Sequence, residues 1–138
     1  MIESLLGSSD VEKRVAPVYA RTVEYDYSKL DASHLLRIPV APNTVVLGVA
    51  HEVLTDFAGG TPAIDVGDGT TASKFVATAD VVPGTAGTFT LKMGGANCKK
   101  YINAGAIVIT GSAGLTAGKG KLTIFEINYD GNGRLAGI

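Results

Sequence analysis

The stretch Thr44–Leu54, TVVLGVAHEVL, decides the fold class because its apolar residues recur at every second position. In an extended chain successive side chains point to opposite faces, whereas the faces of a helix repeat every 3.6 residues. One face of this stretch would carry the side chains of Val45, Leu47, Val49 and Val53. The period of two therefore predicts a β-strand over about eleven residues.

Seven further stretches have strand-like patterns and are separated by clusters of turn-forming residues. They are Ala16–Tyr27, Leu35–Val40, Ala63–Val66, Lys74–Ala77, Thr88–Met93, Ala106–Thr110 and Lys121–Tyr129. The 18 glycines among 138 residues favour the same arrangement, since glycine permits tight turns between strands. About eight short strands are typical of a β-sandwich. The sequence therefore predicts an all-β, single-domain β-sandwich over residues 17–130.

The two ends of the chain do not continue this pattern. Residues 1–16 are expected to form an N-terminal arm with Leu5 and Leu6 as apolar anchors, because Pro17 stops any short helix there. Little helix is expected outside this arm. Residues 131–138 are expected to be a flexible C-terminal tail, since they follow turn-forming residues and show no period.

The composition argues against several classes of protein. A net charge of −1 gives no basic excess for binding nucleic acid. No apolar run approaches the 18 or so residues of a membrane span, and the N-terminus lacks the pattern of a signal peptide, so synthesis in a cytoplasm is expected. The single cysteine, Cys98, cannot form an internal disulfide.

The stretch Ile64–Thr71, IDVGDGTT, could be a metal loop or a turn between strands. A calcium loop needs the pattern D-x-[DN]-x-[DN]-G followed by a glutamate. Asp65 and Asp68 do not have that spacing, and no glutamate follows. We therefore predict that Gly67, Asp68 and Gly69 form a structural turn without a metal.

No pattern of catalytic residues emerges, so the chain is expected to be neither an enzyme nor a cofactor-binding protein. His51 shares the apolar face of its strand, which predicts a hydrogen-bonded residue of the core or of an interface. Cys98 precedes Lys99 and Lys100 but lacks the positioned base that a nucleophile needs. A pocket joining His51, Glu52 and a hydroxyl would instead indicate a small hydrolase.

In the stretch TVEYDYS, Glu24 and Asp26 alternate with two tyrosines. The carboxylates would lie about 7 Å apart on one strand face, as in a glycosidase, but the chain has no tryptophan to stack on a sugar. We interpret the tyrosines as a packing or subunit-contact strip. The candidate subunit or shell contacts are Leu5, Leu6, Tyr19, Tyr25 and Tyr27.

The block from residue 43 to 129 resembles small tailed-bacteriophage virion proteins. In these proteins a long strand runs into T-x-F-x-G, then T-P-x-I-D-V-G-D, and then a short F-V-A-x-A-D strand and a Gly-Thr turn. The matching positions are Thr55, Phe57 and Gly59, followed by Thr61–Asp68 and Phe75–Asp80. The closing stretch TAGKGKLTIFEINY is similar to the last strand of the same proteins.

The resemblance implies a jelly-roll-like β-sandwich that assembles as a homo-oligomer, with a trimer expected, on the head of the virion. The implied function is that of a capsid decoration (cement) protein, which binds the phage major capsid protein and stabilises the shell. The family brings no catalytic residues. The alternative is another virion component, such as a tail, fibre or glycan- or receptor-binding module, which an exposed aromatic patch and affinity for sugar would favour.

Overall fold

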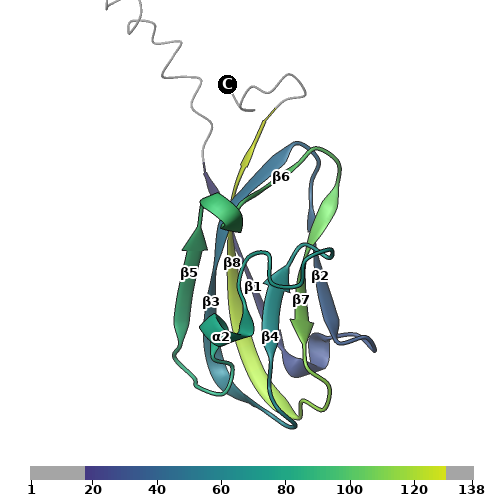
Figure 1. Cartoon of the computed structure of the whole chain (residues 1–138), viewed down its shortest axis with the longest axis vertical. Helices are drawn as coiled ribbons and strands as arrows, with labels where there is room; N and C mark the ends of the chain where they lie inside the picture. Colours follow the sequence, from purple (N-terminus) through teal and green to yellow (C-terminus); the bar gives the residue numbers. More distant parts are fainter. Residues whose placement is uncertain (1–17, 130–138) are drawn as a thin grey trace, which may run out of the picture.

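The computed structural model describes residues 18–129, which form two packed antiparallel sheets (Figure 1). The strands are β1 (Tyr19–Asp26), β2 (Leu35–Val40), β3 (Thr44–Ala58), β4 (Ile64–Gly67), β5 (Phe89–Met93), β6 (Lys99–Tyr101), β7 (Gly105–Gly111) and β8 (Ala117–Asn128). Short helical turns are η2 (Tyr27–Lys29), α2 (Thr78–Val81) and η3 (Gly95–Asn97). The predicted all-β, single-domain sandwich is confirmed.

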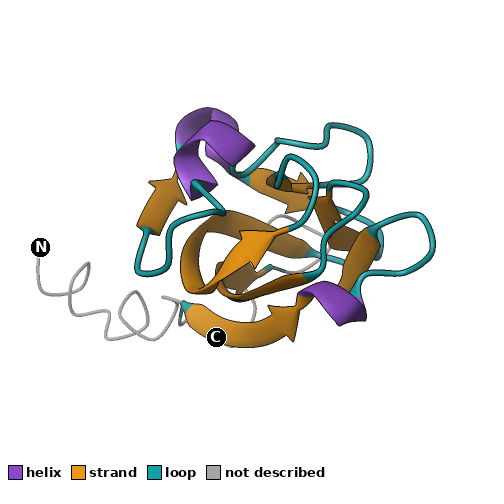
Figure 2. Ribbon diagram, turned by 90° about the horizontal axis from the view of Figure 1, so that it is seen from below, coloured by secondary structure: helices purple, strands orange, loops and turns teal. Residues whose placement is uncertain are grey.

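The larger sheet has the order β1–β8–β3–β5, with β6 also pairing with β3 beyond the end of β5. The smaller sheet has the order β2–β7–β4. Figure 2 shows the strands of the two layers curving around a common interior, with the helical turns at the periphery. Because β1 pairs with β8, the first and last strands lie side by side in the larger sheet.

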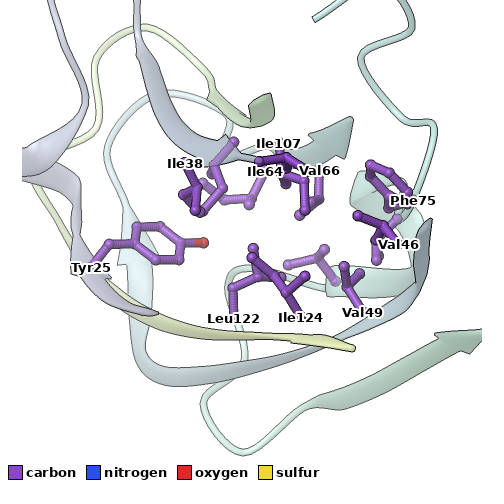
Figure 3. Packing of buried hydrophobic residues seen from close by; sticks show 14 of the residues in the cluster. Tyr25, Ile38, Val46, Val49, Ile64, Val66, Phe75, Ile107, Leu122 and Ile124 are labelled. Carbon is purple, nitrogen blue, oxygen red and sulfur yellow. The ribbon is translucent and has the colours of Figure 1, made fainter. Parts of the chain in front are cut away.

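The core lies between the two sheets and is built from strand residues that alternate inward (Figure 3). The larger sheet contributes Val46, Val49, Leu122 and Ile124. The smaller sheet faces them with Ile38, Ile64, Val66 and Ile107. Complete burial of each such side chain stabilises the fold by about 1.5–3 kcal/mol relative to exposure.

A bulge in β3 changes the predicted side-chain alternation. The pairing of β3 with β8 shifts register between Val46 and Gly48. Val46 and Val49 are both fully buried although they are three positions apart, whereas Val45 and Leu47 are only half-buried. The prediction that Val45 and Leu47 share the face of Val49 is therefore wrong, because the extra residue of a bulge shifts the alternation.

Two segments differ from the predicted strands. Lys74–Ala77 is not a strand, since only Val76 forms a bridge, with Val66. The chain instead turns into α2, whose first N–H, at Thr78, donates to the Asp65 carboxylate at 2.8 Å. The short strand β6 was not predicted, because three residues containing two lysines carry no readable period.

The predicted arm (1–16) and tail (131–138) lie outside the described residues, and so do Leu5 and Leu6. The first predicted strand begins at Tyr19 among the described residues and ends at Asp26, one residue earlier than predicted.

Candidate interaction surface

Tyr25 of β1 and His51 of β3 meet inside the core. Their exposures are 2% and 0%, and the Tyr25 hydroxyl lies 2.6 Å from His51 Nε2 in a buried hydrogen bond. The tyrosine ring crosses the intervening strand β8 at Gly120, where a Cβ would lie 2.8 Å from the ring (Figure 3 shows the ring between the sheets). The missing side chain at Gly120 is therefore what lets Tyr25 reach His51.

Burial keeps both side chains uncharged near neutral pH. It lowers the pKa of His51 to about 4 and raises the pKa of the Tyr25 phenol. Glu52 lies on the opposite side of β3 from His51, because successive strand residues alternate. His51 and Glu52 therefore do not share the pocket that a hydrolase would need.

The structure separates the three candidate contact tyrosines. Tyr25 is a core residue, so the packing alternative holds for it, and its prediction as a surface contact is wrong. Tyr19 and Tyr27 remain available at the surface, with exposures of 48% and 39%. Their role as contacts stays a prediction.

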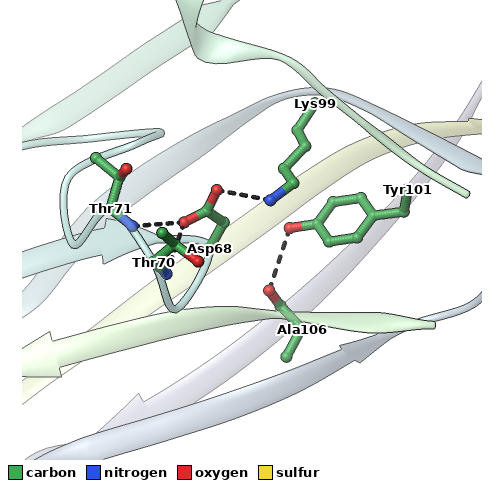
Figure 4. Close-up of polar contacts among 6 residues, drawn as sticks. All are labelled: Asp68, Thr70, Thr71, Lys99, Tyr101 and Ala106. Atoms are coloured by element: carbon green, nitrogen blue, oxygen red, sulfur yellow. Dashed lines mark hydrogen bonds and ion pairs between the residues drawn. The ribbon is translucent and has the colours of Figure 1, made fainter. Parts of the chain in front are cut away.

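Asp68 organises the loop that follows β4 (Figure 4). Its carboxylate accepts hydrogen bonds from the N–H groups of Thr70 and Thr71 at 2.9 and 2.7 Å, and pairs with Lys99 Nζ at 2.7 Å. Gly67 permits this turn, since a Cβ there would lie 2.1 Å from the Thr71 carbonyl oxygen. The turn thus links the end of β4, in the smaller sheet, to β6 in the larger one.

The electrostatics of this turn favour the ionised carboxylate. Burial alone would raise the pKa of Asp68, but the hydrogen bonds from Lys99, Thr71 and Thr70 outweigh it and hold the pKa at about 2. Beside it, Tyr101 donates its hydroxyl to the Ala106 carbonyl at 3.1 Å. Among residues 18–129, no three His, Cys, Asp or Glu side chains gather as a metal site would require.

The other polar candidates take part in local turns. Asp26 accepts a hydrogen bond from the Ser28 N–H at 2.8 Å and caps η2, while Glu24 is exposed. The Cys98 thiol donates to the Gly95 carbonyl at 3.2 Å within the loop before β6. A shallow hollow on the smaller sheet is lined by Arg37, Thr70 and Thr110 with apolar neighbours, and has no carboxylate, histidine or cysteine in its wall.

The largest exposed apolar feature of the described strands is on β5. Phe89, Leu91 and Met93, here called the β5 strip, have exposures of 62%, 54% and 45%. They alternate with Thr90 and Lys92, so all three share one face of the strand. Their partners on β3 are Glu52, Ala50 and Gly48, which lie on the face of the larger sheet that points away from the core.

Neighbouring residues extend this apolar face without covering it. Ala50 and Gly48 add no bulk beside Leu91 and Met93, and half-buried Phe125 of β8 lies across Gly48. Exposed apolar groups that gather in this way on a sheet face mark interaction surfaces in soluble proteins.

Sequence reasoning missed the β5 strip. The alternation in FTLKM predicts a strand with one apolar face, but it does not indicate whether that face is buried. Only the pairing with β3 shows that the apolar face of this strand points outward, since His51 and Val49, which point inward, pair with Thr90 and Lys92.

Comparison with known proteins finds likeness in three dimensions alone. No model of a protein family matches the sequence. No curated protein sequence matches it either. The described part of the chain contains no helix long and apolar enough to cross a membrane.

Chains in three phage capsid structures share the fold. One is from the acid-stable capsid of Helicobacter pylori bacteriophage KHP30, with a TM-score of 0.61 and 16% identity over 83% of this chain and 97% of that one. Another is from the capsid of Ralstonia phage GP4, with a TM-score of 0.59 and 16% identity over 84% and 88%. A third is from the capsid of cyanophage Pam1, with a TM-score of 0.58 and 15% identity over 80% and 84%.

Proposed function

We propose that this chain is a structural protein of a phage virion, and more narrowly a capsid decoration (cement) protein that binds the head shell and stabilises it. The observation that carries this function is the likeness to chains of three phage capsid structures, which extends over at least 80% of each partner in every comparison. The shared unit in each comparison is therefore the sandwich itself and not a small part of it.

The surface of the molecule supports a role in contacts. A fold by itself is compatible with many functions, so the residues it presents matter more. The β5 strip is exposed, whereas Tyr25, His51 and Asp68 are engaged by partners inside the protein. A decoration protein needs exposed residues that are free to make contacts, because each contact is repeated many times by the symmetry of the shell.

The proposed partner is the phage major capsid protein. Tyr19 and Tyr27 lie near the two ends of β1 with exposed side chains, and we assign them to the shell contact together with Leu5 and Leu6. Removing apolar area from water stabilises such a contact by about 25 cal/mol per Å². The working form is a homo-oligomer, and the trimer expected from the resemblance fits the threefold sites that shells offer.

The strand order supports the jelly-roll-like description of the sandwich. The order β1–β8–β3, continued by β6 on β3, faces β2–β7–β4, so the first and last strands are neighbours and so are the second and seventh. Jelly rolls wind their chain in this nested way, through two Greek keys.

The experiment adds purified protein to phage heads that lack it. Three forms are compared: the full chain, a chain without residues 1–16, and the double variant Tyr19→Ala/Tyr27→Ala. Binding is followed by co-sedimentation, and protection by the loss of intact heads on heating or dilution. The full chain is expected to bind and protect, and the other two forms to do so less.

The variant Thr22→Ala serves as the control, since Thr22 is exposed on β1 between the two tyrosines but carries no apolar bulk. A full chain that neither sediments with the heads nor delays their loss would overturn the proposal. Sedimentation with tails or fibres, and not with heads, would replace it with the other virion role.

A further inference from the structure

Strand β5 forms an open edge of the larger sheet, and in Figure 1 it is the outermost element on its side. Just before β5 the Thr88 carbonyl accepts a hydrogen bond from Val53 N–H, and just after β5 the Gly94 N–H donates to the Leu47 carbonyl. In an antiparallel pair, alternate residues turn their N–H and C=O groups toward the partner. Thr90 and Lys92 therefore face β3, while Phe89, Leu91 and Met93 turn their backbone groups to the free edge.

The β5 strip thus leaves both apolar side chains and backbone hydrogen-bonding groups without a partner in the described residues. Its three side chains are exposed and apolar, and its backbone groups have no partner strand among residues 18–129. Proteins that keep such an edge single usually blunt it with an inward-pointing charge, a proline or a covering loop. β5 has one such inward-pointing charge, Lys92, but the carboxylate of Asp80 pairs with it at 3.6 Å and offsets it, and in the described part of the chain the outer face of the strand has no charge, proline or covering loop of its own.

The sequence of β5 is complementary to itself. If two copies lie antiparallel and centred on Leu91, Leu91 faces its counterpart and Phe89 faces Met93 of the other copy. Thr90 then faces Lys92, so no two like charges are opposed. Each free N–H on one strand meets a free C=O on the other, because the residues that pair are those whose backbone groups point outward.

We propose that two copies of this chain pair through β5 by a twofold axis at Leu91, which joins their larger sheets into one continuous sheet. The other edge of the sheet fits this role less well. On the outer face of β1 the residues Ala20, Thr22 and Glu24 alternate, and a β5 strand placed there would set its apolar side chains against a threonine and a glutamate.

The pairing goes beyond the proposed function and is a property of the free chain. A twofold contact cannot close a trimer, since it relates copies in pairs. If the chain is trimeric, the β5 contact joins one trimer to the next, and neighbouring threefold sites on an icosahedral shell are related in this way by twofold axes.

Disulfide trapping tests the contact directly. In a Cys98→Ser background, Leu91→Cys would place two thiols at directly opposed positions, where Cα atoms lie about 5.5 Å apart and a disulfide can form. Thr22→Cys, exposed at the same level of the β1 edge, is the matched control. We expect Leu91→Cys to form disulfide-linked dimers at least on the order of tenfold faster, because pairing raises the local thiol concentration.

Light scattering supplies the second measurement. Leu91→Glu opposes two carboxylates at the twofold axis, so its mass should fall by about half where single chains pair, while Thr22→Glu keeps the mass of the natural chain. Melting curves establish that both variants are folded. Equal cross-linking rates for the two cysteine variants, or equal masses for Leu91→Glu and the natural chain, would overturn the pairing.

These outcomes separate the two proposals. If the chain cross-links through residue 91 but fails to bind heads, the decoration role is overturned and the pairing is supported. A Leu91→Glu chain that has the mass of the natural chain yet no longer binds heads shows instead that β5 docks on the shell, which overturns the pairing and leaves the decoration role in place.

Discussion

At the residue scale, the core of this protein contains a polar pair joined by one buried hydrogen bond, while the other ring nitrogen, His51 Nδ1, has no partner among the described residues. Among the described residues, Tyr25 Oη has no side-chain hydrogen-bond partner other than His51 Nε2, and His51 Nε2 has none other than Tyr25 Oη. A buried polar group that loses its partner costs more than the bond itself contributes. The hydrogen bond thereby fixes the relative position of β1 and β3, which pair with β8 and not with each other.

Tyr25→Phe is expected to lower the free energy of unfolding by about 1–3 kcal/mol, because it leaves His51 Nε2 buried without a partner. Urea denaturation measures the change. Tyr27→Phe is the control, since Tyr27 is exposed and such a change should stay within about 0.5 kcal/mol. Similar losses in the two variants would show that the buried bond does not matter.

His51 should also make the stability depend on pH. Burial holds its folded-state pKa at about 4, below the ordinary value of 6.5, so the unfolded chain binds the proton first as the pH falls. Its contribution is complete above pH 6.5 and is lost progressively down to about pH 4, by about 3 kcal/mol in total. Urea denaturation measures the free energy of unfolding at each pH in this range, and this free energy should vary less with pH in His51→Gln than in the natural chain. An identical dependence on pH in the two proteins would contradict the assignment.

Calcium and magnesium are expected to leave the melting temperature unchanged. The Asp68 carboxylate already accepts two N–H groups and pairs with Lys99, so an entering ion would have to displace them. A tight site saturated at about a thousandfold its Kd would add about 4 kcal/mol and raise the melting temperature clearly. A rise that disappears in Asp68→Asn would show that the turn does bind metal.

At the element scale, the strands with a clean period of two were predictable, and those set by context were not. Leu35–Val40 was predicted with its observed bounds. Lys74–Ala77 has a strand-like composition, yet only Val76 finds a bridge before α2 begins. Strand existence depends on a partner, and a single sequence does not show which partner is in reach.

The candidate surface shows the same limit. Tyr19, Tyr25 and Tyr27 are equivalent in the sequence, and only Gly120 on the neighbouring strand makes room for one of them in the core. Likewise, FTLKM reads as a strand, but whether its apolar face is buried depends on its register with β3. Burial is decided by pairing, which local pattern does not contain.

Gly48→Ala should weaken the pairing of β3 with β5. A Cβ at this position would lie 2.2 Å from the Lys92 carbonyl oxygen, which belongs to the backbone and cannot rotate away. We expect a loss of about 1–3 kcal/mol in the free energy of unfolding, typical of overpacking. Gly84→Ala, where a Cβ meets nothing within 4 Å, is the control, and equal losses would refute a steric cause.

At the scale of the whole molecule, the order of the strands governs how the chain must fold. β1 pairs with β8, and β3 pairs with both β5 and β8, so most of the sheet joins segments that are distant in sequence. Contacts of this kind require large loops to close before they stabilise anything. Local structure alone therefore cannot hold an early intermediate together.

Refolding from urea is expected to take milliseconds to seconds, as for other sandwiches rich in distant contacts, and not microseconds. Stopped-flow tyrosine fluorescence at low protein concentration measures this rate, since the chain has no tryptophan. Far-ultraviolet circular dichroism should follow the same time course, because one core spans both sheets. Refolding complete within microseconds would contradict a barrier set by this topology.

The antiparallel pairing of β1 with β8 also gives the molecule a direction. Tyr19 lies opposite Glu126, so the chain enters and leaves the described fold at one pole, as Figure 1 shows, while the turn from β7 into β8 lies at the other. A peptide or reporter fused genetically to either terminus would join the sandwich at the same pole. Cargo inserted directly before Val18 and cargo inserted directly after Tyr129 would therefore both leave the sandwich on the same side of the molecule.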